Sequence, residues 1–382
     1  MGNARRTIRP PLTRQTLTGV VPNLSARCAE HPALDFLTNC LRGVGMAGFL
    51  GNPLTGTIML VTVWWVSPWF GALVSVGVVA STATAALLGF DRADARLGLY
   101  GFNGALTGAG AGVLLAPSWS PTVLALAAAA AAVTALTMGA LMCFMTRTWG
   151  VPPLALPMNG VLMMLVIALQ QADVTHLRPY VTPPDPTRPL SVDPTLRDTP
   201  AAIAGTDSLT DHVRAVLHGI SQLFFLESVP AALVFLVAIA LFSRLLAALA
   251  LLGSAAAVAT ATLMGFDGFL VYVGVVGLNG ALVCMAIGGV FLTPSVKSAV
   301  LGIAAAAGSC VVFSALNAVM RVWGLPSSLS LAYCLIVPVV TVLKSKVGGV
   351  VAAAPAPTES GEGPIETATP QGTELDRAAR TV

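Results

Sequence analysis

Long stretches of this chain carry no charged side chain. Residues 43–90, 97–146 and 298–320 contain no Asp, Glu, Lys or Arg. A transmembrane helix needs about 20 mostly apolar residues, so each of these stretches has room for one or two spans. The pattern predicts an integral membrane protein made of α-helices.

Apolar segments of helical length recur along the chain, separated by short polar or proline-containing breaks. They fall into two sets of about five, and the shorter ones have the length of tilted or re-entrant helices. We expect helices near residues 54–67, 69–89, 97–116, 120–145, 152–171, 230–243, 245–264, 268–292, 298–319 and 328–343.

The two sets are related by an internal repeat. LLGFDRADARLGLYGFNGALTGAG, which begins at Leu87, matches LMGFDGFLVYVGVVGLNGALVCMA, which begins at Leu263. The shared Asn-Gly-Ala-Leu blocks begin at Asn103 and Asn279, an offset of 279 − 103 = 176 residues. LRGVGMAGFLGNP and LHGISQLFFLESVP match at the same offset, and a Trp-Gly-x-Pro block recurs at an offset of 174. Three blocks in one order indicate a duplicated membrane body.

The repeat and the composition divide the chain into five parts. The expected parts are a disordered cytoplasmic tail (1–32), a first membrane repeat (33–172), an extramembrane linker (173–208), a second membrane repeat (209–346) and a disordered cytoplasmic tail (347–382). The linker and the second tail are rich in proline and polar residues, which cannot form a packed core.

An odd number of spans in each half would turn the second half upside down relative to the first. The arginines of the first tail and the Lys344/Lys346 pair would then both face the cytoplasm, as the positive-inside rule favours. The fold class we expect is an all-α integral membrane protein with two inverted homologous halves. Each half would have about five transmembrane helices and a short pore half-helix, and inverted halves place a solute path at their shared midplane.

Composition excludes several classes of function. The chain is 55% apolar and 10% charged, and its net charge of +3 argues against binding of nucleic acid. The six cysteines form no CxxC pair, and the four histidines lie outside the long apolar runs. We therefore expect no cofactor, no metal site and no catalytic cluster, and hence no enzyme.

Two kinds of glycine-rich segment could interrupt the helices. One is residues 43–56 with its counterpart 219–230, and the other is the Gly-x-Asn-Gly pair at 101–104 and 277–280. Glycine on either side of Asn permits a bend that would turn backbone groups, together with Asn103 or Asn279, toward a polar solute. The alternative is that these glycines let helices pack closely. Because both halves repeat the motif, we favour the bend.

Few polar side chains repeat in the two halves. Asp91 and Asp267 each precede an apolar run, where capping of a helix is the expected role. Gln222 and Glu227 occur only in the second half, where the first half has Met46 and Gly51. An ion-coupled carrier is expected to bury a titratable group, and Glu227 is the one weak candidate. The sequence therefore favours downhill movement of a neutral solute.

Six bulky apolar residues form two related sets of three. If the segments around them are helical, residues four apart share one face. They offer either ordinary core packing or a flat apolar slot for a planar solute, and the residues alone do not decide between the two. The six are Phe49, Phe102 and Leu106 with Phe225, Leu278 and Leu282.

At this point the sequence resembles the urea transporter family over about residues 36–345. The motifs that carry the resemblance are LRGVGMAGFLGNPLTG, GLYGFNGALTG, WGVPPLALPMN, LHGISQLFFLE, GLNGALVCMAIGG and WGLPSSLSLAYC. The resemblance implies ten membrane helices with two pore half-helices. It also implies homotrimers in a cell membrane, with one channel-like urea pore per protomer.

The resemblance assigns roles by matching positions. It implies that the six apolar residues form two facing slots, that Ala47 and Leu223 add to the walls, and that Gln222 lies at one mouth. Met46 at the other mouth departs from the family, which often has Gln or Glu there. The family also has a threonine from each half at the midpoint, where this chain has Ala155 and either Ser330 or Leu329.

We therefore expect passive, channel-like transport of urea across the plasma membrane, with the bilayer, urea and further copies of the chain as partners. The alternative is an ion-coupled or uncoupled carrier for another small neutral polar solute, such as a short amide or ammonia. A further alternative is a membrane protein without a transport role.

Overall fold

The computed structural model describes residues 31–115, 119–171, 208–266, 268–325 and 327–343. Within these ranges the protein is built from helices, so the expected all-α class is confirmed. The linker and both tails lie almost wholly outside the described residues, and their expected disorder stays a prediction. The helices of the first half are α3 (Pro32–Met46), α4 (Pro53–Val66), α5 (Pro68–Leu87), α6 (Arg92–Arg96), α7 (Leu99–Leu115), α8 (Pro121–Trp149) and α9 (Leu156–Gln171).

Each of these helices has a counterpart in the second half, in the same order. The 3-10 turn η3 follows α10, and the π-helical turn η4 continues α14. The elements are α10 (Leu209–Ser221), η3 (Gln222–Phe224), α11 (Val229–Ala240), α12 (Arg244–Leu263), α13 (Gly268–Tyr272), α14 (Val275–Met285), η4 (Ala286–Val290), α15 (Val296–Val322) and α16 (Leu331–Leu343).

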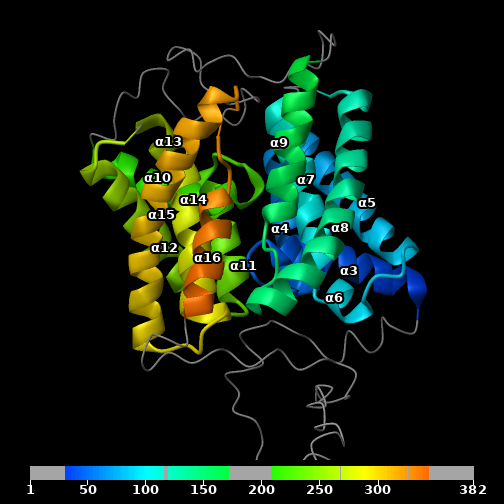
Figure 1. The fold of residues 1–382 in the computed structure, drawn as a ribbon, viewed down its shortest axis with the longest axis horizontal. Helices are drawn as coiled ribbons and strands as arrows, with labels where there is room; N and C mark the ends of the chain where they lie inside the picture. The colour runs from blue at the N-terminus through cyan, green and yellow to red at the C-terminus, as the bar shows by residue number, and fades with distance from the viewer. Residues whose placement is uncertain (1–30, 116–118, 172–207, 267, 326, 344–382) are drawn as a thin grey trace, which may run out of the picture.

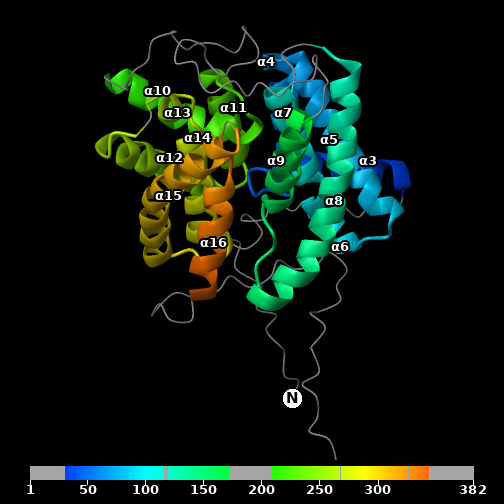
Figure 2. The ribbon, with the colours of Figure 1, turned by 45° about the horizontal axis from the view of Figure 1, so that its top comes forward.

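The two halves lie side by side, and both views keep α3–α9 on one side and α10–α16 on the other (Figures 1 and 2). They meet where α4 packs on α11 and α9 packs on α16. In Figure 1, α9 rises toward its end, whereas its counterpart α16 descends toward its end. These opposite directions are those that inverted halves require.

Glycines at matching positions let the inner helices pack closely. Gly104 on α7 and Gly280 on α14 lie where an added Cβ would collide with α5 or α12, respectively. The expected bends at 101–104 and 277–280 are therefore wrong, because both segments are continuous helix within α7 and α14. The glycines serve instead for the close approach of helices, which was the alternative interpretation.

The first glycine-rich segment is mostly helical as well. The expectation of irregular backbone over 43–56 is wrong at both ends, because α3 continues to Met46 and α4 begins at Pro53. A break of six residues, 47–52, separates the two helices. In the second half the same break bends α10 with η3 against α11 by 71°. The expected half-helices correspond to α3 and α10 with these breaks.

Several helices start after a short polar side chain that caps them, in some cases followed by proline. Asn52 accepts a hydrogen bond from the Leu54 N–H, and the proline that follows it occupies the first turn, where its missing N–H costs nothing. Asp91 caps α6 through the N–H groups of Ala93 and Asp94, as expected. Its counterpart Asp267 lies outside the described residues.

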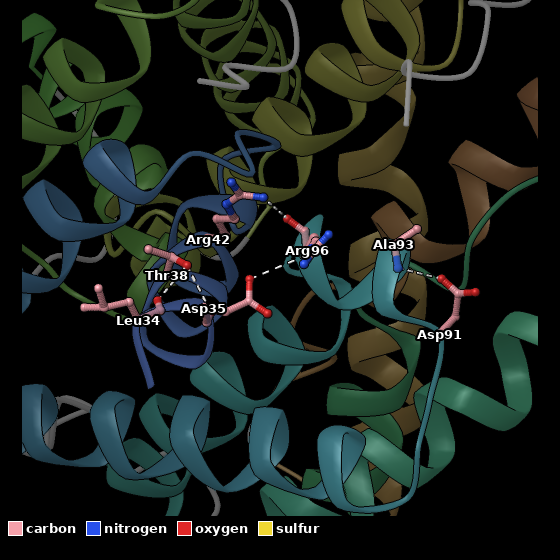
Figure 3. Close-up of polar contacts among 7 residues, drawn as sticks. All are labelled: Leu34, Asp35, Thr38, Arg42, Asp91, Ala93 and Arg96. Atoms are coloured by element: carbon pink, nitrogen blue, oxygen red, sulfur yellow. Dashed lines mark hydrogen bonds and ion pairs between the residues drawn. The ribbon is translucent and has the colours of Figure 1, made fainter. Parts of the chain in front are cut away.

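Equivalent polar contacts tie α3 and α10 to the short helices that precede α7 and α14. The buried Arg42 donates from Nη1 to the Arg96 carbonyl at 2.7 Å, and Arg96 forms an ion pair with Asp35 (Figure 3). In the second half the Nδ1 of His218 hydrogen-bonds the Tyr272 carbonyl at 2.8 Å. The two halves therefore make the same contact to a backbone carbonyl, through Arg42 in the first half and His218 in the second.

Four of the described helices are long and apolar enough to cross a membrane by length and composition, namely α5, α8, α12 and α15. The bent pair formed by α10 with η3 and α11 adds a possible fifth. The shorter apolar helices are α4, α9, α14 with η4, and α16. A multi-pass membrane protein is therefore confirmed, whereas the expected total of ten spans stays a prediction.

The close approach of α5 and α7 predicts the effect of a single methyl group. Gly104→Ala should lower the thermal unfolding temperature of the detergent-solubilised protein, because the new methyl meets Ser81 and the cost of overpacking is about 1–3 kcal/mol. Gly160→Ala on α9 is the matched control, since a Cβ there meets open space. Equal unfolding temperatures for the two variants would contradict the packing described.

Candidate functional site

Two phenylalanines at matching positions adopt a strained backbone conformation. Phe49 (φ 61°) follows α3, and Phe225 (φ 58°), 176 residues later, follows η3. A left-handed conformation in a residue other than glycine costs about 1–3 kcal/mol and persists where surrounding structure imposes it. Each N–H closes a tight turn, Phe49 to the Met46 carbonyl and Phe225 to the Gln222 carbonyl. The strain places both rings at the breaks between helices.

Both rings reach the opposite half of the protein. The ring of Phe49 meets the ring of Tyr333 on α16 edge-on, with centroids 6.1 Å apart and planes at 78°. The Cζ of Phe225 lies 3.5 Å from where a Cβ on Gly110 of α7 would stand. The two halves therefore share the apolar walls around these rings, whereas the sequence grouped the six residues by half.

The side chains expected to form walls on α7 and α14 are buried but not completely inaccessible to solvent. Phe102 and Leu106 are 8% and 9% exposed, and Leu278 and Leu282 are each 7% exposed. The intervening Ala105 is fully buried. Because each pair is four residues apart, its two members lie on the same face of their helix.

The chain next forms two irregular loops that the sequence reasoning missed. Leu154 (φ 58°) lies between α8 and α9, and its counterpart Leu329 (φ 49°) lies between α15 and α16. The repeated Trp-Gly-x-Pro blocks that precede them were the available signal. A glycine in a sequence suggests a position with positive φ, whereas a leucine does not.

Asn103 and Asn279 hold these loops in place. The Nδ2 of Asn103 donates to the Leu154 carbonyl at 3.0 Å, and its Oδ1 accepts from the Met158 N–H at 3.2 Å. Asn279 repeats both bonds, with the Leu329 carbonyl at 2.9 Å and the Tyr333 N–H at 3.1 Å. Both amides are fully buried and occupied by backbone. Both amides therefore anchor the loops, and the expected contact of Asn103 and Asn279 with a solute stays a prediction.

The loops also fix the register at the midpoint. Because Leu154 and Leu329 are equivalent, Ala155 corresponds to Ser330 and not to Leu329. Ala155 and Ser330 are each 3% exposed. Asn159 on α9 donates to the Ser330 hydroxyl at 2.9 Å and so connects the two halves. The midpoint therefore has one hydroxyl, contributed by the second half.

The two positions expected at the mouths differ in polarity. Gln222 is buried and donates from Nε2 to the Val273 carbonyl at 2.7 Å, which uses one of its two N–H bonds. Its counterpart Met46 is half-buried and apolar. Ala47 and Leu223, 6% and 7% exposed, follow them in the chain. The mouth of the second half thus has a polar group that the other mouth lacks.

Charge is nearly absent from the interior that the structure describes. Among the described residues, the buried basic side chains are Arg42 and His218. No described Asp, Glu or Lys is buried. Glu227, beside the Phe225 turn, is half-buried and has an interaction partner. The described residues include no group of three or more potential metal ligands. The arrangement suits a neutral solute.

Comparisons with known proteins agree with this geometry. The sequence profile of the family described as "Urea transporter" matches residues 37–345. Urea transporter 1 of Ovis aries is 28% identical over 327 residues, which cover 85% of this chain and 82% of that protein. Urea transporter 1 of Mus musculus is 27% identical over 300 residues, or 78% and 74% of the two chains. The chain therefore belongs to the urea transporter family.

Proposed function

We propose that this protein conducts urea passively through a path between its two halves. Membership of the family over nearly the whole membrane body is the observation that carries the proposal. The matched pair of strained phenylalanines, at positions that the repeat predicts, gives the path a physical basis. Urea transport across a membrane is thus the function, and the channel mechanism is our inference from the residues.

The apolar walls would select for shape. Urea is planar, so the rings of Phe49 and Phe225 with the aliphatic side chains of α7 and α14 can accept it edge-on. Gln222 at one mouth and Ser330 at the midpoint would replace part of its hydration shell. A cation would lose its hydration shell without a compensating ring of charge, and would be excluded.

No carboxylate or lysine is buried in the described interior, and the buried His218 is engaged through Nδ1 with the Tyr272 carbonyl, which argues against ion coupling. A coupled carrier needs a group that binds the driving ion or proton at membrane depth. Glu227, two residues after Phe225, is only half-buried at a helix break. We therefore place the coupled carrier for another neutral solute second.

The assembly and orientation belong to the same proposal. We infer a homotrimer with one path per protomer, in the plasma membrane, with both termini in the cytoplasm. Many large apolar side chains on the outer faces of the helices, among them Trp65 and Met164, are exposed and would contact lipid or neighbouring protomers. The positive residues expected to face the cytoplasm lie outside the described residues.

Urea flux into proteoliposomes tests the function directly. Stopped-flow light scattering of vesicles containing the full-length protein should show faster urea entry than protein-free vesicles, at a rate that does not change with an imposed proton or sodium gradient. Parallel measurements with water, ammonia and acetamide define selectivity. Urea entry no faster than in protein-free vesicles would refute the proposal, and a rate that follows an ion gradient would favour the carrier.

The polarity of the mouths predicts a gain of affinity. Met46→Gln should lower the urea concentration that half-saturates flux by about two- to tenfold, the equivalent of one net hydrogen bond. The Leu97 carbonyl lies beside this mouth as the Val273 carbonyl lies beside Gln222, so the new amide has a similar anchor. Met46→Leu is the matched control and should leave half-saturation unchanged. An equal effect of both substitutions would contradict a polar role for this position.

A further inference from the structure

Asn159 makes a set of bonds that joins the two halves at the midpoint of the proposed path. Its Nδ2 donates to the Ser330 hydroxyl at 2.9 Å and to the Ala155 carbonyl at 2.8 Å. Its Oδ1 accepts from the Ser330 backbone N–H at 3.2 Å. The side chain is fully buried. One amide therefore holds Ser330 through both its backbone and its side chain.

The direction of these bonds follows from chemistry. A backbone N–H can only donate, so the amide oxygen of Asn159 must face the Ser330 N–H, and the amide nitrogen must face the hydroxyl. An amide nitrogen is only a donor, so the Ser330 oxygen accepts this bond. The hydroxyl hydrogen of Ser330 consequently points away from Asn159.

The bonds of Asn159 have no equivalent made by the matching residue of the second half. Asn103 and Asn279 perform equivalent tasks within their own halves, whereas the counterpart of Asn159 in α16 is Cys334. Cys334 is reached by the Asn159 amide only at 3.8 Å, through its sulfur. Sulfur is a weak acceptor and a thiol a weak donor. The first half thus contributes an amide where the second half has none.

Ser330 lies among the residues of the proposed walls. The preceding residue, Leu329, is bound by Asn279 on α14, the helix that carries Leu278 and Leu282. Three residues later, the ring of Tyr333 meets Phe49. Ser330 therefore stands in the chain between a residue held by α14 and a residue whose ring contacts Phe49.

We propose that Asn159 is a positioning residue that turns the hydroxyl of Ser330 into a hydrogen-bond donor for the carbonyl oxygen of the passing urea. This proposal rests on the proposed function. The bond from Asn159 uses one lone pair of the Ser330 oxygen and fixes the hydroxyl hydrogen on the side away from Asn159, so the hydrogen is available to the path. Urea has a strong acceptor in its carbonyl oxygen, and Ala155 leaves the first half without a hydroxyl of its own. One oriented donor thus serves a midpoint that lacks a second one.

Thiourea gives a readout that a merely structural role would not change. It has nearly the shape of urea, but its sulfur is a much weaker acceptor than oxygen. In proteoliposomes of the full-length protein, Asn159→Ala should lower the ratio of urea to thiourea permeability by about two- to tenfold, the equivalent of one hydrogen bond. Ser330→Ala should lower the ratio equally, and the double variant should fall no further than Ser330→Ala alone.

Asn317→Ala is the matched control. Asn317 is also a buried asparagine that holds this loop, through a 2.6 Å bond from the Ser328 N–H, but it reaches from α15 in the same half. It should keep the permeability ratio of the unchanged protein. Should Asn159→Ala fail to fold, Ser330→Ala still tests the proposal, because it removes the hydroxyl and leaves the backbone bond to Asn159 in place.

Other outcomes overturn the proposal. Equal losses of urea and thiourea flux in Asn159→Ala, additive losses in the double variant, or an unchanged ratio in Ser330→Ala would each refute the positioning role while leaving urea conduction intact. Absence of urea flux in the unchanged protein would refute the proposed function, and the role of Asn159 with it.

Discussion

Irregular backbone at membrane depth must have its polar groups satisfied by protein, because the bilayer offers no hydrogen bonds. Two buried asparagines meet this requirement here. Asn103 and Asn279 each bind a loop carbonyl and a helix N–H, and so hold Leu154 and Leu329 in left-handed conformations. The bonds to the Met158 and Tyr333 N–H groups also tie the first turns of α9 and α16 to α7 and α14. The midpoint of the path depends on that placement.

Duplication explains much of the architecture, and departures from it carry the specific chemistry. The repeat preserves strained phenylalanines, close glycine contacts and asparagine anchors, which all concern geometry. It does not preserve the polar groups along the path. Gln222 in the second half corresponds to Met46 in the first, and Ser330 corresponds to Ala155. A passive path tolerates such asymmetry, since it needs walls of constant shape and only a few polar contacts.

The sequence predicted the helical class, the duplication and the capping by Asp91, because apolar runs and repeated blocks are local signals. It failed at Gly-Phe-Asn-Gly, where glycine permits both a bend and a close contact, and only the position of α5 decides between them. The left-handed conformations of Leu154 and Leu329 gave no signal beyond the Trp-Gly-x-Pro blocks before them, since asparagines about 50 residues away hold them. The partnership of Asn159 with Ser330 spans 171 residues and required the fold.

A structure of the purified protein at saturating urea tests the central claim most directly. The account predicts planar density for urea between the halves, in contact with the ring of Phe49 or Phe225 and, at the midpoint, with its carbonyl oxygen toward the hydroxyl of Ser330. A matched structure without urea should lack this density. Ordered urea confined to the outer surface, with the space between α7, α14 and the two phenylalanines closed to solute, would contradict the account.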